Sequence, residues 1–255
     1  MTKLTFLGTG TSQGIPVIGC KCEVCMSNDP RDNRLRTSAM IETEGKTLVV
    51  DTGPDFRQQM LRAEVENVDA VLYTHEHKDH VAGMDDIRPF NFKHKKPLEM
   101  YASDAVQVAL KREFHYVFSD YKYPGVPQVN LHDISHEAPF EVEGLEVMPI
   151  RVMHYKMPVL GFRIGDLAYV TDAKTIDDKE LDKLKGLDVL VLNALRIQPH
   201  ISHFNLEDAI EMVNFLKPKR AYFTHISHLL GLHEKVAPTL PENIWLAHDG
   251  LVVEC

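Results

Sequence analysis

One short run of the sequence, residues 75–80 (HEHKDH), is dense in side chains that bind metals. Imidazole and carboxylate groups are ligands that Zn²⁺, Mn²⁺ and iron accept in proteins. Four such groups are too many for one catalytic ion, which must keep a position open for water or substrate. The run therefore predicts two adjacent metal ions, and its candidate ligands are His75, His77, Asp79 and His80.

Three more candidate ligands stand alone, far along the chain. They are His154, Asp172 and His225, and each directly follows an apolar stretch that predicts a buried strand. One polar residue at the end of a strand is ordinary in any protein. Three of them in addition to the His-rich run complete the ligand set of a dinuclear site, which is a common centre for hydrolysis.

A second group of metal-binding residues lies near the N-terminus. Cys20, Cys22 and Cys25 follow the spacing C-x-C-x-x-C, and the fourth cysteine of the chain is Cys255. Three cysteines so close together are a poor layout for structural disulfides. The spacing favours a metal site, and the alternative is three free or redox-active thiols.

Short strands and helices that position these groups alternate along the whole chain. The clearest helix runs to Lys217, because apolar side chains recur at i, i+3, i+4 and i+7 after Asn205, a favourable N-cap. Pro54 predicts the first turn of another helix, and Ser103 the N-cap of a third. Apart from the helix that ends at Lys217, the expected helices are therefore 54–63, 104–117 and 178–185. The expected strands are 3–7, 37–43, 46–50, 69–73, 145–153, 161–171 with a turn near residues 165–166, 187–192 and 220–223.

The composition is that of one ordinary globular domain, residues 1–255, with 44 % hydrophobic and 25 % charged residues. No run of ~18 apolar residues predicts a membrane span. The N-terminus lacks the features of a signal peptide, so the expected location is the cytoplasm. The net charge of −9 argues against general nucleic-acid binding, which needs a surplus of cations. The basic run 93–96 is expected to be a solvated loop.

The order H-x-H-x-D-H, then His, Asp and His, resembles the metallo-β-lactamase superfamily. The resemblance covers essentially the whole chain and implies an α/β fold, the four-layer αββα sandwich. It also implies how the seven ligands are divided between two metals. His75, His77 and His154 hold one ion; Asp79, His80 and His225 hold the other; and Asp172 bridges them.

The segment 7–16 (LGTGTSQGIP) and the cysteines after it are similar to the start of the PhnP-type phosphodiesterases, which act on phosphoribosyl cyclic phosphates. The resemblance implies a structural zinc held by the three cysteines and His228. It also implies a catalytic histidine before the penultimate helix, for which His203 matches best and His200 is the other candidate. The segments 84–90 and 171–175 depart from the phosphonate enzyme, so the resemblance does not extend to its pathway.

These features predict a metal-dependent phosphodiesterase for small substrates, cyclic phosphodiesters among them. Two divalent ions, Zn²⁺ or Mn²⁺, would generate a bridging hydroxide that attacks phosphorus. Asp79 and Asp172 would hold the ions, and His203 would protonate or stabilise the leaving oxygen. Asp51, at the end of a predicted strand, is interpreted as an acceptor that orients a ligand histidine, a role compatible with that of a turn residue.

Three other functions are compatible with the same motifs. The first is hydrolysis of a different ester, such as a thioester or a lactone. The second is tRNA 3′-processing, although the sequence has no basic arm and is acidic. The third is a mononuclear iron dioxygenase, against which the seven ligands argue. The expected partner is a small-molecule phosphodiester, with no membrane; a homodimer is left open.

Overall fold

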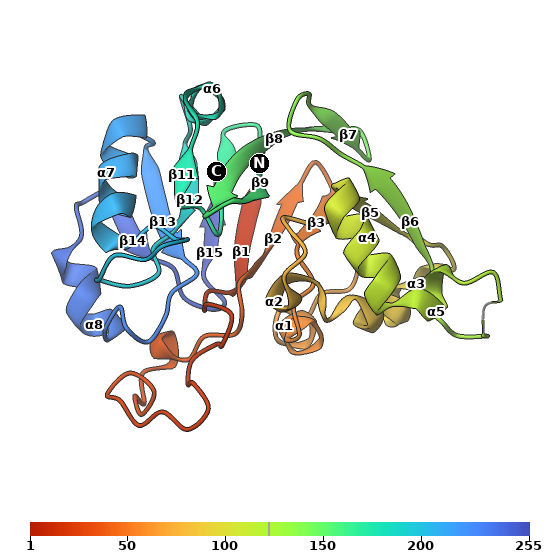
Figure 1. Ribbon diagram of the computed structural model, residues 1–255, viewed down its shortest axis with the longest axis horizontal. Coiled ribbons are helices and arrows are strands. Elements are labelled where there is room, and N and C mark those ends of the chain that lie inside the picture. The colour runs from red at the N-terminus through yellow and green to blue at the C-terminus, as the bar shows by residue number, and fades with distance from the viewer. Residues whose placement is uncertain (122) are drawn as a thin grey trace.

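The computed structural model describes residues 1–121 and 123–255 and has two β-sheets packed face to face, with helices on their outer faces (Figure 1). This arrangement confirms the four-layer α/β sandwich expected from the motifs. Helices α1 to α5 flank the first sheet, and α7 and α8 flank the second (Figure 1). Within the described residues no helix is both long enough and apolar enough to span a membrane.

The first sheet carries the N-terminal half of the candidate site. Its strands are antiparallel from β15 to β3 and parallel from β3 to β6. Parallel strands end at the same edge of a sheet, so Asp51 after β3 and the run 75–80 after β4 come together. The order is β15 (Val252–Glu254), β1 (Lys3–Gly8), β2 (Ser38–Thr43), β3 (Lys46–Val50), β4 (Ala70–Leu72), β5 (Leu98–Ala102) and β6 (Val129–Asp133).

The second sheet repeats this design. Strands β10, β12, β13 and β14 are parallel, so Asp172 after β10 and His225 after β13 reach the same edge. The order is β11 (Thr175–Ile176), β8 (Leu145–His154), β9 (Met157–Ile164), β10 (Leu167–Tyr169), β12 (Val189–Asn193), β13 (Arg220–Thr224) and β14 (Ile244–Leu246), and β7 (Phe140–Val142) pairs with β8.

The helices are short, and most of them cover a sheet. The α-helices are α1 (Phe56–Arg62), α2 (Lys78–Val81), α3 (Arg88–His94), α4 (Asp104–Glu113), α5 (His115–Phe118), α6 (Asp178–Leu181), α7 (Leu206–Leu216) and α8 (His233–Val236). The 3₁₀ helices are η1 (Pro30–Asp32), η2 (Met84–Ile87), η3 (Asp182–Leu184) and η4 (Ala237–Thr239).

The core has one layer between the sheets and one on each outer face. Strand β12 shows why: Val189 and Val191 belong to the central layer, whereas Leu190 and Leu192 pack in the layer beneath α7. Successive side chains of a strand point to opposite faces, so a strand covered on both sides must be apolar throughout. This explains the unbroken apolar runs that precede the ligands.

The helix boundaries differ from the expected ones in three places, one of which is 178–185, where α6 is followed directly by the 3₁₀ helix η3. The helix expected from Pro54 begins at Phe56, and Asp55 is its N-cap. The helix expected over 104–117 breaks at Phe114 into α4 and α5, and Ser103 holds the N-cap position without a side-chain cap bond. Asn205 is confirmed as a cap, because its side chain accepts a hydrogen bond from the Asp208 amide.

The strand expectations were confirmed in part. The turn expected near residues 165–166 is present, because β9 ends at Ile164 and the chain returns from Leu167 as the antiparallel strand β10. Strands β5 and β6 were not expected, since their polar residues interrupt the apolar pattern.

Two glycines allow the metal-binding loop to lie against the end of β3. A Cβ atom on Gly53 would lie 2.2 Å from the carbonyl oxygen of Asp79, and one on Gly83 would lie 2.1 Å from the carbonyl oxygen of Gly53. These are backbone contacts, which cannot yield as the end of a flexible side chain can. The loop therefore holds Asp79 against residues that follow the neighbouring strand.

We predict that Gly53→Ala lowers the free energy of unfolding by about 3 kcal/mol, because the backbone must move to admit the methyl group. Gly45→Ala is the control. Gly45 has a φ of 77° but no atom within 4 Å of the added Cβ, so it should cost only about 1–2 kcal/mol. Urea unfolding measures both, and equal losses would contradict the importance of the close contact.

Candidate metal centre

Six of the seven predicted ligands of the dinuclear site, together with His203, form one cluster where strand ends of the two sheets meet. Within each of three groups the ligand atoms lie within 4.8 Å of one another. His80 and Asp172 each belong to two groups, so the three groups form one continuous cluster. The groups are His75, His80 and Asp172; Asp79, His80 and His225; and His154, Asp172 and His203.

His77 completes the set from the rim of this cluster. Its ring centroid lies 4.7 Å from that of His75 and 5.3 Å from that of His154. It is the N-cap residue of α2, exposed to solvent, whereas His75 is buried. The three imidazoles assigned to the first metal are therefore neighbours, and one of them borders the solvent.

Asp172 lies between the two halves of the site. Its Oδ1 atom is 3.2 Å from His225 Nε2, and its Oδ2 atom is 3.4 Å from His80 Nε2. The Thr171 hydroxyl also donates to Oδ2 at 2.7 Å. The two oxygens of this buried carboxylate thus face different imidazoles, which is the arrangement that a bridging ligand needs.

Asp51 orients two of the ligand histidines. Its Oδ2 atom is 2.7 Å from His80 Nδ1, and it also accepts a hydrogen bond from the Thr74 hydroxyl at 2.8 Å. Because that hydroxyl donates to Asp51, it accepts from His75 Nδ1 at 2.9 Å. Both histidines therefore carry their proton on Nδ1 and turn the lone pair of Nε2 to the cluster. The expected contact of Asp51 with a candidate ligand histidine is therefore present.

The cluster suits metal ions because its residues do not satisfy the hydrogen-bonding capacity of one another's ring nitrogens. Six buried ring nitrogens of the cluster have no hydrogen-bond partner among the described residues: His75 Nε2, His80 Nε2, His154 Nδ1, His203 Nδ1, and both Nδ1 and Nε2 of His225. An unpaired buried polar atom costs free energy, and several in one place call for a ligand. Burial lowers the pKa of His75 and His225, which leaves both neutral, the form that binds a metal.

Three site residues adopt a backbone conformation that side chains other than glycine rarely adopt. The φ angles of Asp51, Asp172 and His225 are 65°, 58° and 55°. Each residue directly follows a strand or lies within three residues of its end, Asp51 in the first sheet and Asp172 and His225 in the second. Left-handed residues concentrate at functional sites, where the surrounding structure holds them in place. The sharp turns let the side chains point into the cluster.

His203, not His200, is the candidate catalytic histidine that reaches the cluster. Its Nδ1 atom is 3.7 Å from Asp172 Oδ1, and its ring centroid is 4.5 Å from that of His154. The His200 ring lies 5.1 Å from that of His203 and is only half-buried. Burial, helped by the neighbouring His225, lowers the pKa of His203 to about 2. The neutral ring can donate one N–H hydrogen bond.

The three cysteines and His228 form a separate group at the base of the N-terminal loop. The Sγ atoms of Cys20, Cys22 and Cys25 lie 3.4, 3.3 and 3.6 Å from His228 Nδ1. In a tetrahedral zinc site with Zn–S of about 2.3 Å and Zn–N of about 2.0 Å, these pairs would be about 3.5 Å apart. The geometry and the donor set therefore both fit a closed Cys₃His zinc site.

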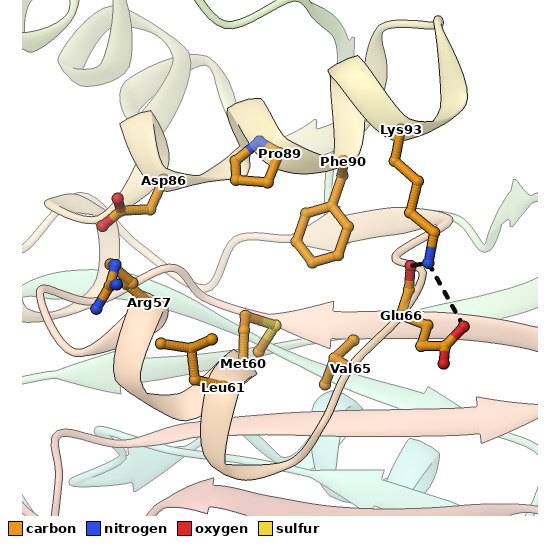
Figure 2. A pocket seen from close by; sticks show the side chains of 9 residues that line it. All are labelled: Arg57, Met60, Leu61, Val65, Glu66, Asp86, Pro89, Phe90 and Lys93. Carbon is orange, nitrogen blue, oxygen red and sulfur yellow. Dashed lines mark hydrogen bonds and ion pairs between the residues drawn. The ribbon is translucent and has the colours of Figure 1, made fainter.

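A large cavity elsewhere in the molecule is unrelated to these ligands. It has a volume of about 490 Å³ and lies between α1 and α3 (Figure 2). Lys93 closes one end by contacting Glu66 (Figure 2). No ligand of either candidate site is among its lining residues, which are Arg57, Met60, Leu61, Val65, Glu66, Asp86, Pro89, Phe90 and Lys93.

The chain belongs to the β-lactamase superfamily, whose domain model matches residues 46–226. The matched segment contains all seven candidate ligands of the dinuclear site, and it ends before His228. The predicted superfamily membership is thereby confirmed.

Within that superfamily the chain is PhnP-like. It is 43 % identical to a diphosphatase of the PhnP family of known crystal structure, with a TM-score of 0.93, covering 100 % of this chain and 98 % of that one. It is also similar to a ribonuclease Z of Mycobacterium sp. (strain KMS), at 25 % identity over 214 residues, which are 77 % of this chain and 70 % of the relative.

A third relative is an octanoyltransferase of Porphyromonas gingivalis, 42 % identical over 247 residues. These residues are 96 % of this chain but only 50 % of the relative. The chain thus spans half the length of that protein.

We predict that the purified protein holds about three metal ions, of which one is lost in Cys22→Ser. That variant should melt about 5–10 °C lower, equivalent to about 2–3 kcal/mol, because the N-terminal loop loses its tie to His228. It should keep much of its activity.

His77→Ala is the matched comparison and should show the reverse: a lost catalytic metal, little turnover and a smaller drop in melting temperature. Elemental analysis and calorimetry measure both variants. If Cys22→Ser keeps its full metal content and melting temperature, the cysteines are not zinc ligands.

Proposed function

We propose that this chain is a metal-dependent hydrolase that cleaves phosphorus–oxygen bonds in small phosphodiesters or diphosphates. The observation that carries the proposal is the buried cluster of imidazoles and carboxylates with unpartnered nitrogens. The likeness to a PhnP-family diphosphatase over the full chain supports phosphorus as the centre attacked.

The proposed ligands are divided as the neighbouring contacts suggest. His75, His77 and His154 would hold one ion, and the second would take Asp79, His80 and His225, with Asp172 shared. Two such metal ions would lower the pKa of a bound water molecule and would offer positive charge to the phosphate oxygens. Zn²⁺ and Mn²⁺ both suit these ligands, and the Cys₃His group would hold a further, structural zinc.

The surrounding residues prepare the site for this chemistry. Asp51 and Thr74 fix the orientation of His75 and His80 before any ligand binds. His203 would donate its N–H to the phosphate or to the leaving oxygen. A negatively charged substrate beside His203 raises the pKa of the ring, which favours transfer of a proton to the leaving group.

The substrate class follows from charge and size. With a net charge of −9, the chain is a poor match for a long polyanion such as tRNA. In the basic run 93–96, Lys93 is already engaged by Glu66. We therefore propose a small-molecule substrate and a cytoplasmic enzyme, and we assign the ribonuclease Z likeness to shared fold and metal ligands.

The octanoyltransferase name belongs, in our proposal, to the half of that relative which this chain does not match. Acyl transfer through the enzyme needs a nucleophile such as a thiol or an amine in the site. Neither group is present among the clustered ligands of the dinuclear centre. Three of the four cysteines surround His228, and Cys255 lies at the end of the chain.

A turnover panel tests the proposed reaction. With added Mn²⁺ or Zn²⁺, we expect bis-p-nitrophenyl phosphate, a cyclic ribose phosphate or ADP-ribose to be hydrolysed at least ~10-fold faster than p-nitrophenyl phosphate. A monoester carries more charge and has no second ester oxygen. Asp172→Asn should abolish turnover but not folding, since asparagine tolerates the left-handed backbone. Preference for an octanoyl thioester over every phosphorus ester would overturn the assignment.

The two candidate histidines can be separated by matched substitutions. His203→Gln should lower kcat by about 10²–10³-fold with KM and metal content nearly unchanged, because it removes a proton donor and no metal ligand. His200→Gln should lower kcat less than about fivefold. Equal losses in the two variants, or loss of metal from His203→Gln, would contradict the assigned role.

A further inference from the structure

The turn that follows His154 contains an unexpected residue. His154 of β8 pairs with Met157 of β9, so the hairpin loop consists of only Tyr155 and Lys156. Tyr155 has a φ of 57°. Two-residue hairpins usually place Gly, Asn or Asp where φ is positive, and a bulky residue there is an outlier.

Packing of the Tyr155 side chain does little to offset this backbone strain. Tyr155 is 54 % exposed, and no hydrogen bond of its hydroxyl is present in the described part of the chain. Its ring contacts the next residue, because Lys156 Nζ lies over the ring, 5.3 Å from the centroid. A strained, exposed aromatic residue without a structural role is a sign of function.

The turn also adjoins the candidate metal centre. Tyr155 is bonded to His154, whose ring lies 4.5 Å from that of His203 and 5.3 Å from that of the exposed His77. Consecutive Cα atoms are about 3.8 Å apart, so the backbone of the turn lies next to a candidate ligand of the cluster. An aromatic and a basic residue thus follow directly on a candidate ligand of a site that would accept phosphate esters.

We propose that Tyr155 and Lys156 select substrates that carry a planar group next to the phosphate, such as a nucleoside. The planar group stacks on the Tyr155 ring, and Lys156 pairs with a phosphate oxygen. The contact of the ammonium with the ring holds the two side chains together before substrate binds. This inference rests on the proposed phosphorus–oxygen hydrolysis and names its substrate class.

The test compares two esters with the same leaving group: thymidine 5′-(p-nitrophenyl phosphate) and methyl p-nitrophenyl phosphate. Tyr155→Gly should raise KM for the thymidine ester about tenfold and change kcat/KM for the methyl ester less than twofold. Tyr155→Phe should retain the wild-type KM. Because glycine relieves the strain, Tyr155→Gly should also melt about 2–4 °C higher than the wild type.

Glu44→Gly is the matched control. Glu44 is an exposed hairpin residue with a φ of 50°, at the end of β3 opposite to Asp51. It should raise the melting temperature similarly and leave both esters unaffected. If Tyr155→Gly lowers the melting temperature, or changes both esters equally, Tyr155 is a structural residue and the inference fails.

Failure of the proposed function has a different signature. In that case the wild-type protein hydrolyses neither ester, and the inference is then tested by calorimetric titration of the Mn²⁺-loaded protein with ADP. Binding that is about tenfold weaker in Tyr155→Gly supports nucleoside recognition. Equal binding by the two proteins overturns it.

Discussion

A cluster of buried polar groups that cannot satisfy one another is the constraint on which this structure depends. Asp51 and Asp172 are almost fully excluded from water, and so are His75, His80 and His225. Buried carboxylates and unpaired imidazole nitrogens are costly unless a cation or a hydrogen bond compensates them. Asp51 is compensated by protein donors, whereas Asp172 and the free Nε2 atoms face one another. Cations bound among them would turn a destabilising arrangement into a stabilising one.

The fold brings these polar groups together because the strands that precede them end in the same region. In each sheet the parallel strands end at one edge, and the two edges meet at the cluster. The backbone of the N-terminal loop is hydrogen-bonded to Ile226, the residue that follows His225. The Thr11 amide donates to the Ile226 carbonyl at 3.0 Å, and the Ile226 amide donates to the Thr9 carbonyl at 2.8 Å. Buried Arg34 in turn donates to the Thr9 hydroxyl and to the Ala247 carbonyl.

The two candidate metal groups are coupled through this same loop. His228 follows His225 by three residues, and the cysteines that surround it lie in the segment after Thr11. The superfamily model ends at residue 226, whereas the likeness to the PhnP-family diphosphatase covers the whole chain. The candidate dinuclear ligands thus all lie inside the segment that the superfamily model matches, whereas the cysteines and His228 lie outside it. Because one fold supports many chemistries, the residues around the cluster must select the substrate.

The sequence by itself determined the kind of site, because its ligands obey local rules. The run 75–80 follows one apolar strand, and each remaining ligand follows another, so residue type and strand pattern together identify them. The cap of α7 was equally predictable, since Asn205 contacts an amide three residues away. In these cases the physical cause lies within a few residues of its effect.

Only the tertiary structure decided the contacts between distant segments. His200 and His203 are indistinguishable by spacing, and the packing of their loop on His154 and Asp172 selects His203. The pairing of Asp51 with His80 spans 29 residues, and that of Cys22 with His228 spans 206. The break between α4 and α5 and the polar strands β5 and β6 depend likewise on their neighbours. No local pattern encodes these features, because the interactions that stabilise them exist only after the sheets have assembled.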